Sequence, residues 1–140
     1  MKKIMIVCSS FLYDKIPEIE KELKDFEIIY PNGYGKTYDD TRYEDMTHQE
    51  YVDFFKEMYF MSRDKISKVD ACLVLNFDKT KNGQTLNNYI GASTFLEMYE
   101  AFMQGKEIYC MNELPDNLLN EELRGFDPVI LHGDLSLIKR

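Results

Sequence analysis

Glu97 is the residue of this sequence whose type and position are best suited to chemistry. It follows small and hydroxyl residues at positions 91–94, which are typical of a helix start, and Asp78 follows the apolar run that ends at Phe77. In open α/β sheets, ligands bind outside the carboxyl ends of the strands, where strands lead into helices. A carboxylate at such a junction can take part in catalysis, and a helix N-terminus can bind an anion. We therefore expect residues 70–106 to determine the function.

Glu97 also has a purely structural interpretation. Thr94 and Glu97 have the spacing of a capping box, in which the glutamate carboxylate accepts a hydrogen bond from the N-cap backbone amide. Glu97 would then lie in the first turn of its helix and stabilise the helix start. The sequence leaves both interpretations open.

The hydrophobic pattern predicts the elements that position these residues. Continuous apolar runs, typical of strands covered on both faces, predict strands at residues 3–8, 26–30, 71–77, 107–111 and 128–131. Helices are predicted at residues 17–24, 47–67, from 91–94 to a C-cap at Gly105, and 115–124, the second with a capping box at Thr47 and Glu50. Strands that alternate with helices imply right-handed crossovers and a parallel sheet. We predict an α/β fold, a flavodoxin-like doubly wound five-stranded parallel sheet in three αβα layers, with strand order 2-1-3-4-5.

A long segment without clear periodicity separates the second strand from the second helix. Residues 33–46 are rich in Tyr, Asp and Gly and are expected to form a surface loop, and loops of this length are often functional. Tyr34, Tyr38 and Tyr43 are either stacking groups of a lid or exposed tyrosines of this loop.

Composition limits the class of protein and its partners. The 140 residues suit one domain spanning positions 1–140, and 44% hydrophobic content with 14% aromatic residues is enough for a core. A net charge of −8 argues against a nucleic acid polymer as partner. Cys8, Cys72 and Cys110 lie in or beside apolar runs and are expected to be buried, reduced thiols. No segment has the length of a membrane span or a secretory signal, so we expect a cytoplasmic protein with no membrane partner.

Several known chemistries of this architecture lack their residues here. Cys8-Ser9-Ser10 replaces the paired acids of a phosphorylatable receiver, and Asp14 stands where a low-molecular-weight phosphatase loop needs Arg. The sequence has no dinucleotide or Walker phosphate loop. His48 and His132 lack the spacing of a metal site and are expected at the surface. We predict neither a metal ion nor a cofactor.

The region from about residue 63 to 106 resembles the nucleoside 2-deoxyribosyltransferase superfamily, which includes deoxynucleoside monophosphate N-hydrolase-like proteins. The shared pattern is a strand beside an acid, a turn containing Gly or Ser, and a helix with a glutamate before A-x-x-x-G-K. Its counterparts here are residues 69–75, residues 91–94, Glu97, and Ala101 with Gly105-Lys106. Glu97 falls on the family's nucleophilic glutamate.

The resemblance implies a mechanism and a set of binding residues. Glu97 would attack C1′ of a nucleoside or nucleotide, displace the base and form a glycosyl ester, which water or a second base resolves. The residues expected to bind the substrate are Ser9, Ser10, Asp78, Asn88, Gly91 and Ser93. Because relatives complete their pockets across subunits, and because residues 54–61 and 95–103 are rich in aromatic residues, we expect a homodimer or higher homo-oligomer.

Two positions differ from the family pattern and support a second hypothesis. The family's first-strand tyrosine corresponds to Met5 or Ile6, and its aspartate corresponds to Ser62, with Asp64 two residues away. These differences favour a non-catalytic nucleotide-binding or sensing module that kept the pocket but lost the chemistry, whereas Glu97 favours the enzyme.

Overall fold

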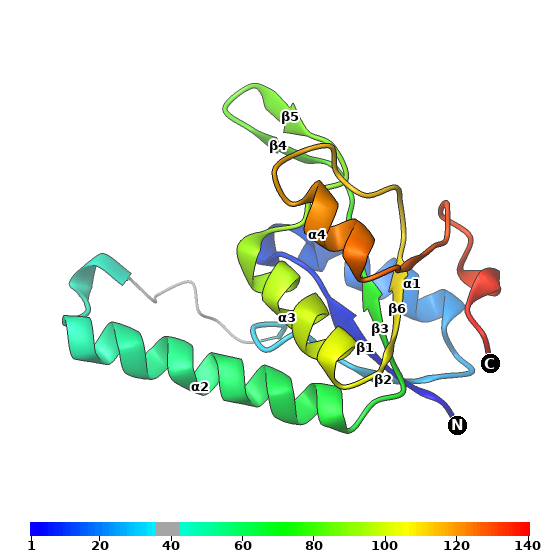
Figure 1. Ribbon diagram of the computed structural model, residues 1–140, viewed down its shortest axis with the longest axis horizontal. Coiled ribbons are helices and arrows are strands. Elements are labelled where there is room, and N and C mark those ends of the chain that lie inside the picture. The colour runs from blue at the N-terminus through cyan, green and yellow to red at the C-terminus, as the bar shows by residue number, and fades with distance from the viewer. Residues whose placement is uncertain (36–42) are drawn as a thin grey trace.

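The computed structural model describes residues 1–35 and 43–140, and its centre is a five-stranded parallel sheet (Figure 1). The sheet order is β2-β1-β3-β6-β7. Its strands are β1 (Lys3–Val7), β2 (Glu27–Ile29), β3 (Ala71–Val74), β6 (Glu107–Cys110) and β7 (Val129–Ile130). Numbered along the chain without the separate two-stranded hairpin, this order is 2-1-3-4-5, so the predicted doubly wound flavodoxin-like sheet is confirmed.

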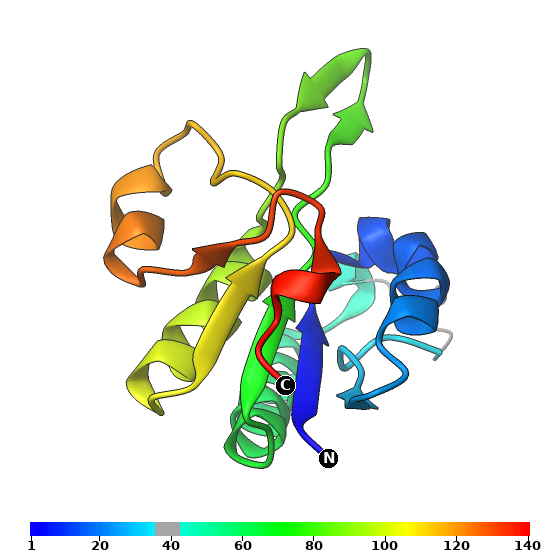
Figure 2. The same ribbon diagram turned by 90° about the vertical axis from the view of Figure 1, so that its right-hand side faces the viewer.

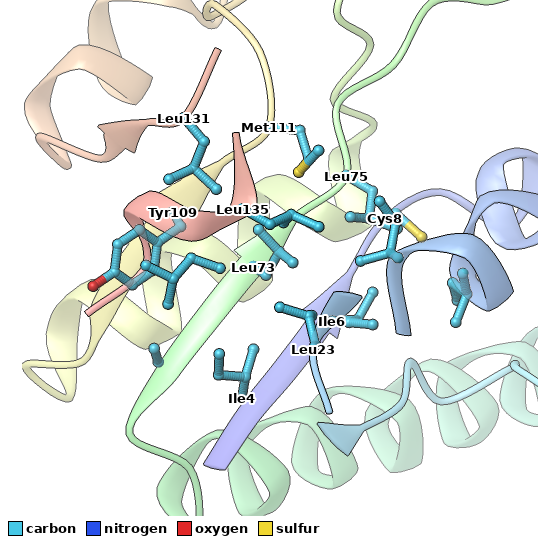
Figure 3. Close-up of a cluster of buried hydrophobic side chains, with 14 of the residues drawn as sticks. Ile4, Ile6, Cys8, Leu23, Leu73, Leu75, Tyr109, Met111, Leu131 and Leu135 are labelled. Atoms are coloured by element: carbon cyan, nitrogen blue, oxygen red, sulfur yellow. The ribbon is translucent and has the colours of Figure 1, made fainter. Parts of the chain in front are cut away.

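Helices cover both faces of the sheet because its strand residues alternate between two cores. Ile4 and Ile6 of β1 pack on the side of η1 (Ser10–Lys15), α1 (Ile16–Glu22) and η3 (Leu135–Leu137), in the cluster that Figure 3 shows. Met5 and Val7 pack on the other side, with α2 (His48–Ser67), α3 (Ala92–Met103) and α4 (Asn120–Gly125). This period of two is what a strand covered on both faces requires.

The starts of the two long helices differ in how well the sequence predicted them. The capping box of α2 is confirmed, since the Thr47 side chain and the Glu50 side chain each accept a hydrogen bond from the other residue's backbone. The capping box that was one of the two interpretations of Thr94 and Glu97 does not form. Gly91 is the N-cap of α3, and its carbonyl accepts from the amide of Phe95 at 2.9 Å. The helix therefore starts three residues earlier than that box requires, and Glu97 lies in its second turn.

Gly105 ends α3, as predicted, with the hydrogen bonds of a Schellman motif. Its φ is +72°, and the amides of Gly105 and Lys106 donate to the carbonyls of Phe102 and Ala101 at 3.0 and 2.9 Å. β6 begins two residues after Gly105, so this turn connects α3 directly to the sheet.

Replacing Gly105 by Ala is expected to destabilise the protein by about 1 kcal/mol, because an L-residue is disfavoured at this positive φ. An added Cβ meets no atom within 4 Å, so the loss is conformational rather than steric. Urea unfolding measures it. Gly125→Ala is the matched control: it also meets no atom and has no positive φ, so it is expected to be neutral or stabilising. Equal losses in both variants would contradict this account.

The predicted loop after β3 is in fact a β-hairpin, β4 (Lys79–Lys81) with β5 (Gln84–Leu86), which extends beyond the carboxyl end of the sheet (Figure 2). Its turn is Asn82-Gly83, with φ of +53° and +75°, a pair favoured in two-residue hairpins. The buried Asn76 anchors the chain before it, exchanging hydrogen bonds with Asn112 in the loop after β6.

Other features of the described chain bear on the remaining predictions. The three thiols of Cys8, Cys72 and Cys110 are buried. None of the helices within residues 1–35 and 43–140 combines the length and the apolar character needed to cross a membrane. Tyr38 and half of the predicted surface loop, residues 36–42, lie outside the described residues.

Candidate functional site

A cavity of about 1240 Å³ opens where β1 and β2 end and α3 begins. The chain passes from β1 to β2 on one side and later to β3 on the other, so this is the point at which the strand order reverses, where open α/β sheets bind ligands. Its polar lining comes from the segments after β1, β2 and β3 and from the first turns of α3, and one wall is α2.

Glu97 is held in this cavity by a side chain of the neighbouring helix. The hydroxyl of Ser62, on α2, donates to Glu97 Oε2 at 3.0 Å. Asn32, in the loop after β2, donates from Nδ2 to Ser62 Oγ at 2.8 Å and to the carbonyl of Met58 at 3.1 Å. Because a carbonyl can only accept, the second bond fixes the orientation of the Asn32 amide. The described residues donate no hydrogen bond to the other carboxylate oxygen, Oε1.

Burial raises the pKa of Glu97 from 4.5 to about 7. The hydrogen bond from Ser62 and the positive charge of Lys65 oppose this increase, but removal of the carboxylate from water outweighs them. Burial and the charge of Glu97 also raise the pKa of the Cys8 and Cys72 thiols to about 12. At neutral pH Glu97 therefore exists in both protonation states, while the two thiols stay protonated.

Such a carboxyl group can do acid, base or nucleophilic chemistry at neutral pH. Perturbed pKa values in clefts are typical of catalytic groups, because a group that titrates near the working pH can both lose and regain its charge. One oxygen of Glu97 is held by Ser62 and the other receives no hydrogen bond from residues 1–35 or 43–140, so an ionised Glu97 presents an unshared electron pair to a bound molecule.

Aromatic rings and cations complete the lining. Tyr43, Phe55 and Tyr59 contribute an aromatic wall, with ring centroids 5.7 Å apart for the first pair and 6.0 Å for the second. Lys79 of the hairpin places Nζ 4.6 Å from the Tyr89 ring centroid and 5.3 Å from that of Phe11. The cavity thus offers flat apolar surfaces, positive charge and the Glu97 carboxylate, which suits a planar, polar ligand.

The structure brings together five of the seven residues predicted to form the site. Ser9, Ser10, Gly91, Ser93 and Glu97 line the same cavity. Asp78 and Asn88 line a second cavity of about 350 Å³ instead. There the Asp78 carboxylate accepts from the backbone amide of Asn88 at 2.9 Å, which closes the base of the hairpin.

The structure also shows where the residues that differ from the pattern of the resembled family lie. Ser62 lies directly against Glu97, whereas Asp64 is exposed and pairs with Lys68 at 2.9 Å on α2. Met5 is fully buried on the α2 and α3 side of the sheet. Asn32 was not predicted as a site residue, because no local sequence signal shows that its amide reaches α2.

Of the predicted loop tyrosines, Tyr43 lines the cavity and Tyr34 does not. Tyr34 stacks on Tyr30 with ring centroids 5.1 Å apart. His48 and His132 are exposed, as expected. Within the described residues, no three His, Cys, Asp or Glu side chains gather in a way that could hold a metal ion.

The sequence matches no protein-family model and no curated protein. Among solved structures, the chain is similar to the CMP N-glycosidase BcmB of Clostridium botulinum, with a TM-score of 0.47 and 12% identity over 92% of this chain and 85% of that chain. The assignment of the fold therefore rests on the observed strand order rather than on this likeness.

Proposed function

We propose that the protein cleaves the bond between base and sugar in a nucleoside or nucleotide, as an N-glycosidase or a transferase, with Glu97 as the nucleophile. The observation that carries this proposal is the setting of Glu97: a carboxyl group with a pKa of about 7, held by Ser62 through one oxygen, in the cavity at the strand ends. The resemblance of residues 63–106 to the nucleoside 2-deoxyribosyltransferase superfamily supports the same role.

The reaction has two steps. The Glu97 carboxylate attacks C1′, a C–O ester bond forms, the C1′–N bond breaks, and its electron pair leaves with the base, which takes a proton from the surroundings. Water or a second base then attacks C1′ and gives up a proton to the surroundings, the ester breaks, and the carboxylate is restored. The carboxylate also stabilises the positive charge that develops on the sugar ring in both steps.

The other residues of the cavity hold the substrate. Ser9, Ser10 and Ser93 supply hydroxyl groups for the sugar or its 5′ group, and Gly91 lets that group approach the backbone. The rings of Phe55 and Tyr59 supply a surface on which a base can stack. Asp78 and Asn88 act indirectly, by closing the hairpin that carries Lys79.

A substrate panel tests the proposal. The protein is incubated with ribo- and deoxyribonucleosides and their 5′-monophosphates, and free base is measured by liquid chromatography. Base release from at least one compound is the expected result. Saturable binding of a nucleotide without base release at any pH from 5 to 9 would contradict it and select the non-catalytic binding module.

Base release is expected to increase with pH up to about 7. Only the ionised carboxylate can attack C1′, so kcat/KM should fall about tenfold for each pH unit below the pKa of Glu97 and level off above it. A profile of kcat/KM from pH 5 to 8.5 measures this. A rate that is constant across that range, or highest at pH 5, would contradict an ionised nucleophile.

The protein is expected to form a homodimer or a higher homo-oligomer. Large apolar side chains are exposed along α2 and α3, among them Tyr59, Phe60, Tyr99, Phe102 and Met103. Neighbouring exposed apolar groups of this kind mark interaction surfaces. Light scattering at micromolar concentration should give at least twice the 16.6 kDa of one chain, and a monomer would contradict the expectation.

A further inference from the structure

We propose that Asn32 and Ser62 are positioning residues that direct one hydroxyl proton onto Glu97 Oε2 and so leave Oε1 as the attacking atom. The inference rests on the proposed function and assigns the two residues that prepare its nucleophile.

A serine inside a helix has a competing acceptor. Its hydroxyl can donate to the backbone carbonyl four residues earlier, and for Ser62 that carbonyl belongs to Met58. A hydroxyl carries one proton, so a Ser62 bonded to Met58 could not donate to Glu97.

Asn32 prevents a hydrogen bond from Ser62 to the Met58 carbonyl by bonding to both groups. One amide group, Nδ2, donates to the Met58 carbonyl at 3.1 Å and to Ser62 Oγ at 2.8 Å. The carbonyl is thereby occupied, and a lone pair of Ser62 is used on the side of Asn32. The Ser62 proton is left to point at Glu97 Oε2, and the two oxygen atoms lie 3.0 Å apart.

The orientation of the Asn32 amide has a cost in stability. Asn32 Oδ1 is buried and has no hydrogen-bond partner among the described residues. A buried acceptor left unpaired is unfavourable, and such exceptions call for a reason. Here the reason is that the amide must turn its N–H₂ group toward Met58 and Ser62, which leaves Oδ1 on the opposite side.

The chain of hydrogen bonds from Asn32 through Ser62 to Glu97, here called the relay, should have a measurable effect on Glu97, because few charges of the described residues act on this carboxyl group. Lys65 on α2 lowers the pKa of Glu97, as does the Ser62 hydrogen bond, while Cys8 and Cys72 on the sheet side remain neutral thiols. Arg63 and Glu100, which also line the cavity, pair with each other. Loss of the hydrogen bond should therefore move the titration of Glu97 to higher pH.

The test uses Ser62→Ala, Asn32→Ala, the double variant, and Ser62→Thr, which keeps a hydroxyl. Each single Ala variant is expected to raise the Glu97 titration midpoint by roughly one pH unit and to lower base release at pH 6 roughly tenfold, with KM changed less than about twofold. The double variant should be no worse than Ser62→Ala, because Asn32 acts through Ser62. Ser62→Thr should restore most of the rate and the wild-type midpoint.

Titration of Glu97 by carbon NMR, with Glu97→Gln to assign its signal, gives the midpoint without any turnover. If the Ala variants raise the titration midpoint of Glu97 but the wild type releases no base, the relay would be upheld and the proposed function overturned. An unshifted midpoint in folded Asn32→Ala, or effects of the two Ala substitutions that add, would overturn the relay while leaving Glu97 as nucleophile. Melting curves of all four variants establish that they are folded.

Discussion

Glu97→Gln is expected to lose base release by a factor on the order of 10³ to 10⁶, the range typical of enzymes deprived of their nucleophile. Glutamine has nearly the shape of glutamate, and its carbonyl oxygen can still accept the hydrogen bond from Ser62. An amide cannot form the glycosyl ester, however, so the first step of the reaction has no nucleophile. Single-turnover base release at pH 7.5 measures the loss.

Glu122→Gln is the matched control for this substitution. Glu122 is an exposed glutamate in the first turn of α4, away from the lining of the cavity. It is expected to release base at the wild-type rate. Turnover of Glu97→Gln within tenfold of the wild type would mean that the carboxylate does not attack the sugar.

The same Glu97→Gln substitution is expected to stabilise the protein at pH 8. The pKa of Glu97 is about 7 in the folded protein, whereas 4.5 is its ordinary value, so between these two values the folded state holds a proton that the unfolded state has released. The stability contributed by this proton is fully present below about pH 4.5 and is lost as pH rises through 7, a loss of roughly 3 kcal/mol at most. Gln does not titrate and avoids the loss.

Urea unfolding of both proteins at pH 4.5, 6, 7 and 8 measures this effect. The difference in unfolding free energy between Glu97→Gln and the wild type should grow in favour of the variant from pH 4.5 to 7 and stay constant above. The charge of Glu97 raises the pKa of the Cys8 and Cys72 thiols, but burial keeps both thiols protonated from pH 4.5 to 8 in either protein, so the difference isolates Glu97. A difference that does not vary with pH would contradict the raised pKa.

An inactive variant that is more stable than the wild type at pH 8 would exclude a purely structural role for Glu97. Replacing a side chain that serves stability lowers the free energy of unfolding. Replacing a catalytic group that is held in an unfavourable environment raises it. The unpaired Asn32 Oδ1 lies in the same hydrogen-bond relay. Two unfavourable groups within one relay are typical of a site whose arrangement serves a function.

The fold was largely readable from the sequence because its signals are local and repeated. The continuous apolar run of β1, the Thr47–Glu50 capping box and the Gly105 C-cap are each determined by a few neighbouring residues, and the structure agrees with all three. The β4–β5 hairpin was missed although its Asn82-Gly83 turn is a recognised hairpin signal. Its strands are exposed and polar, so no apolar run marked them.

The site was less readable because its contacts are not local. Thr94 and Glu97 have the spacing of a capping box, but the Gly91 carbonyl begins the helix and so moves Glu97 into the second turn, where α2 can reach it. The contact between Ser62 and Glu97 joins two helices, and the contact between Asn32 and Ser62 joins a helix to a loop. Such pairings follow from the packing of elements, which sequence periodicity does not specify.

The stereochemistry of the reaction tests the nucleophile most directly. The nucleoside or nucleotide that releases base fastest is incubated with the protein in water containing methanol, and the configuration at C1′ of the methyl glycoside formed is determined by proton NMR. Two successive displacements at C1′, the first by Glu97, predict a product with the configuration of the substrate. An inverted product would show that the acceptor attacks C1′ directly, and it would contradict Glu97 as the nucleophile.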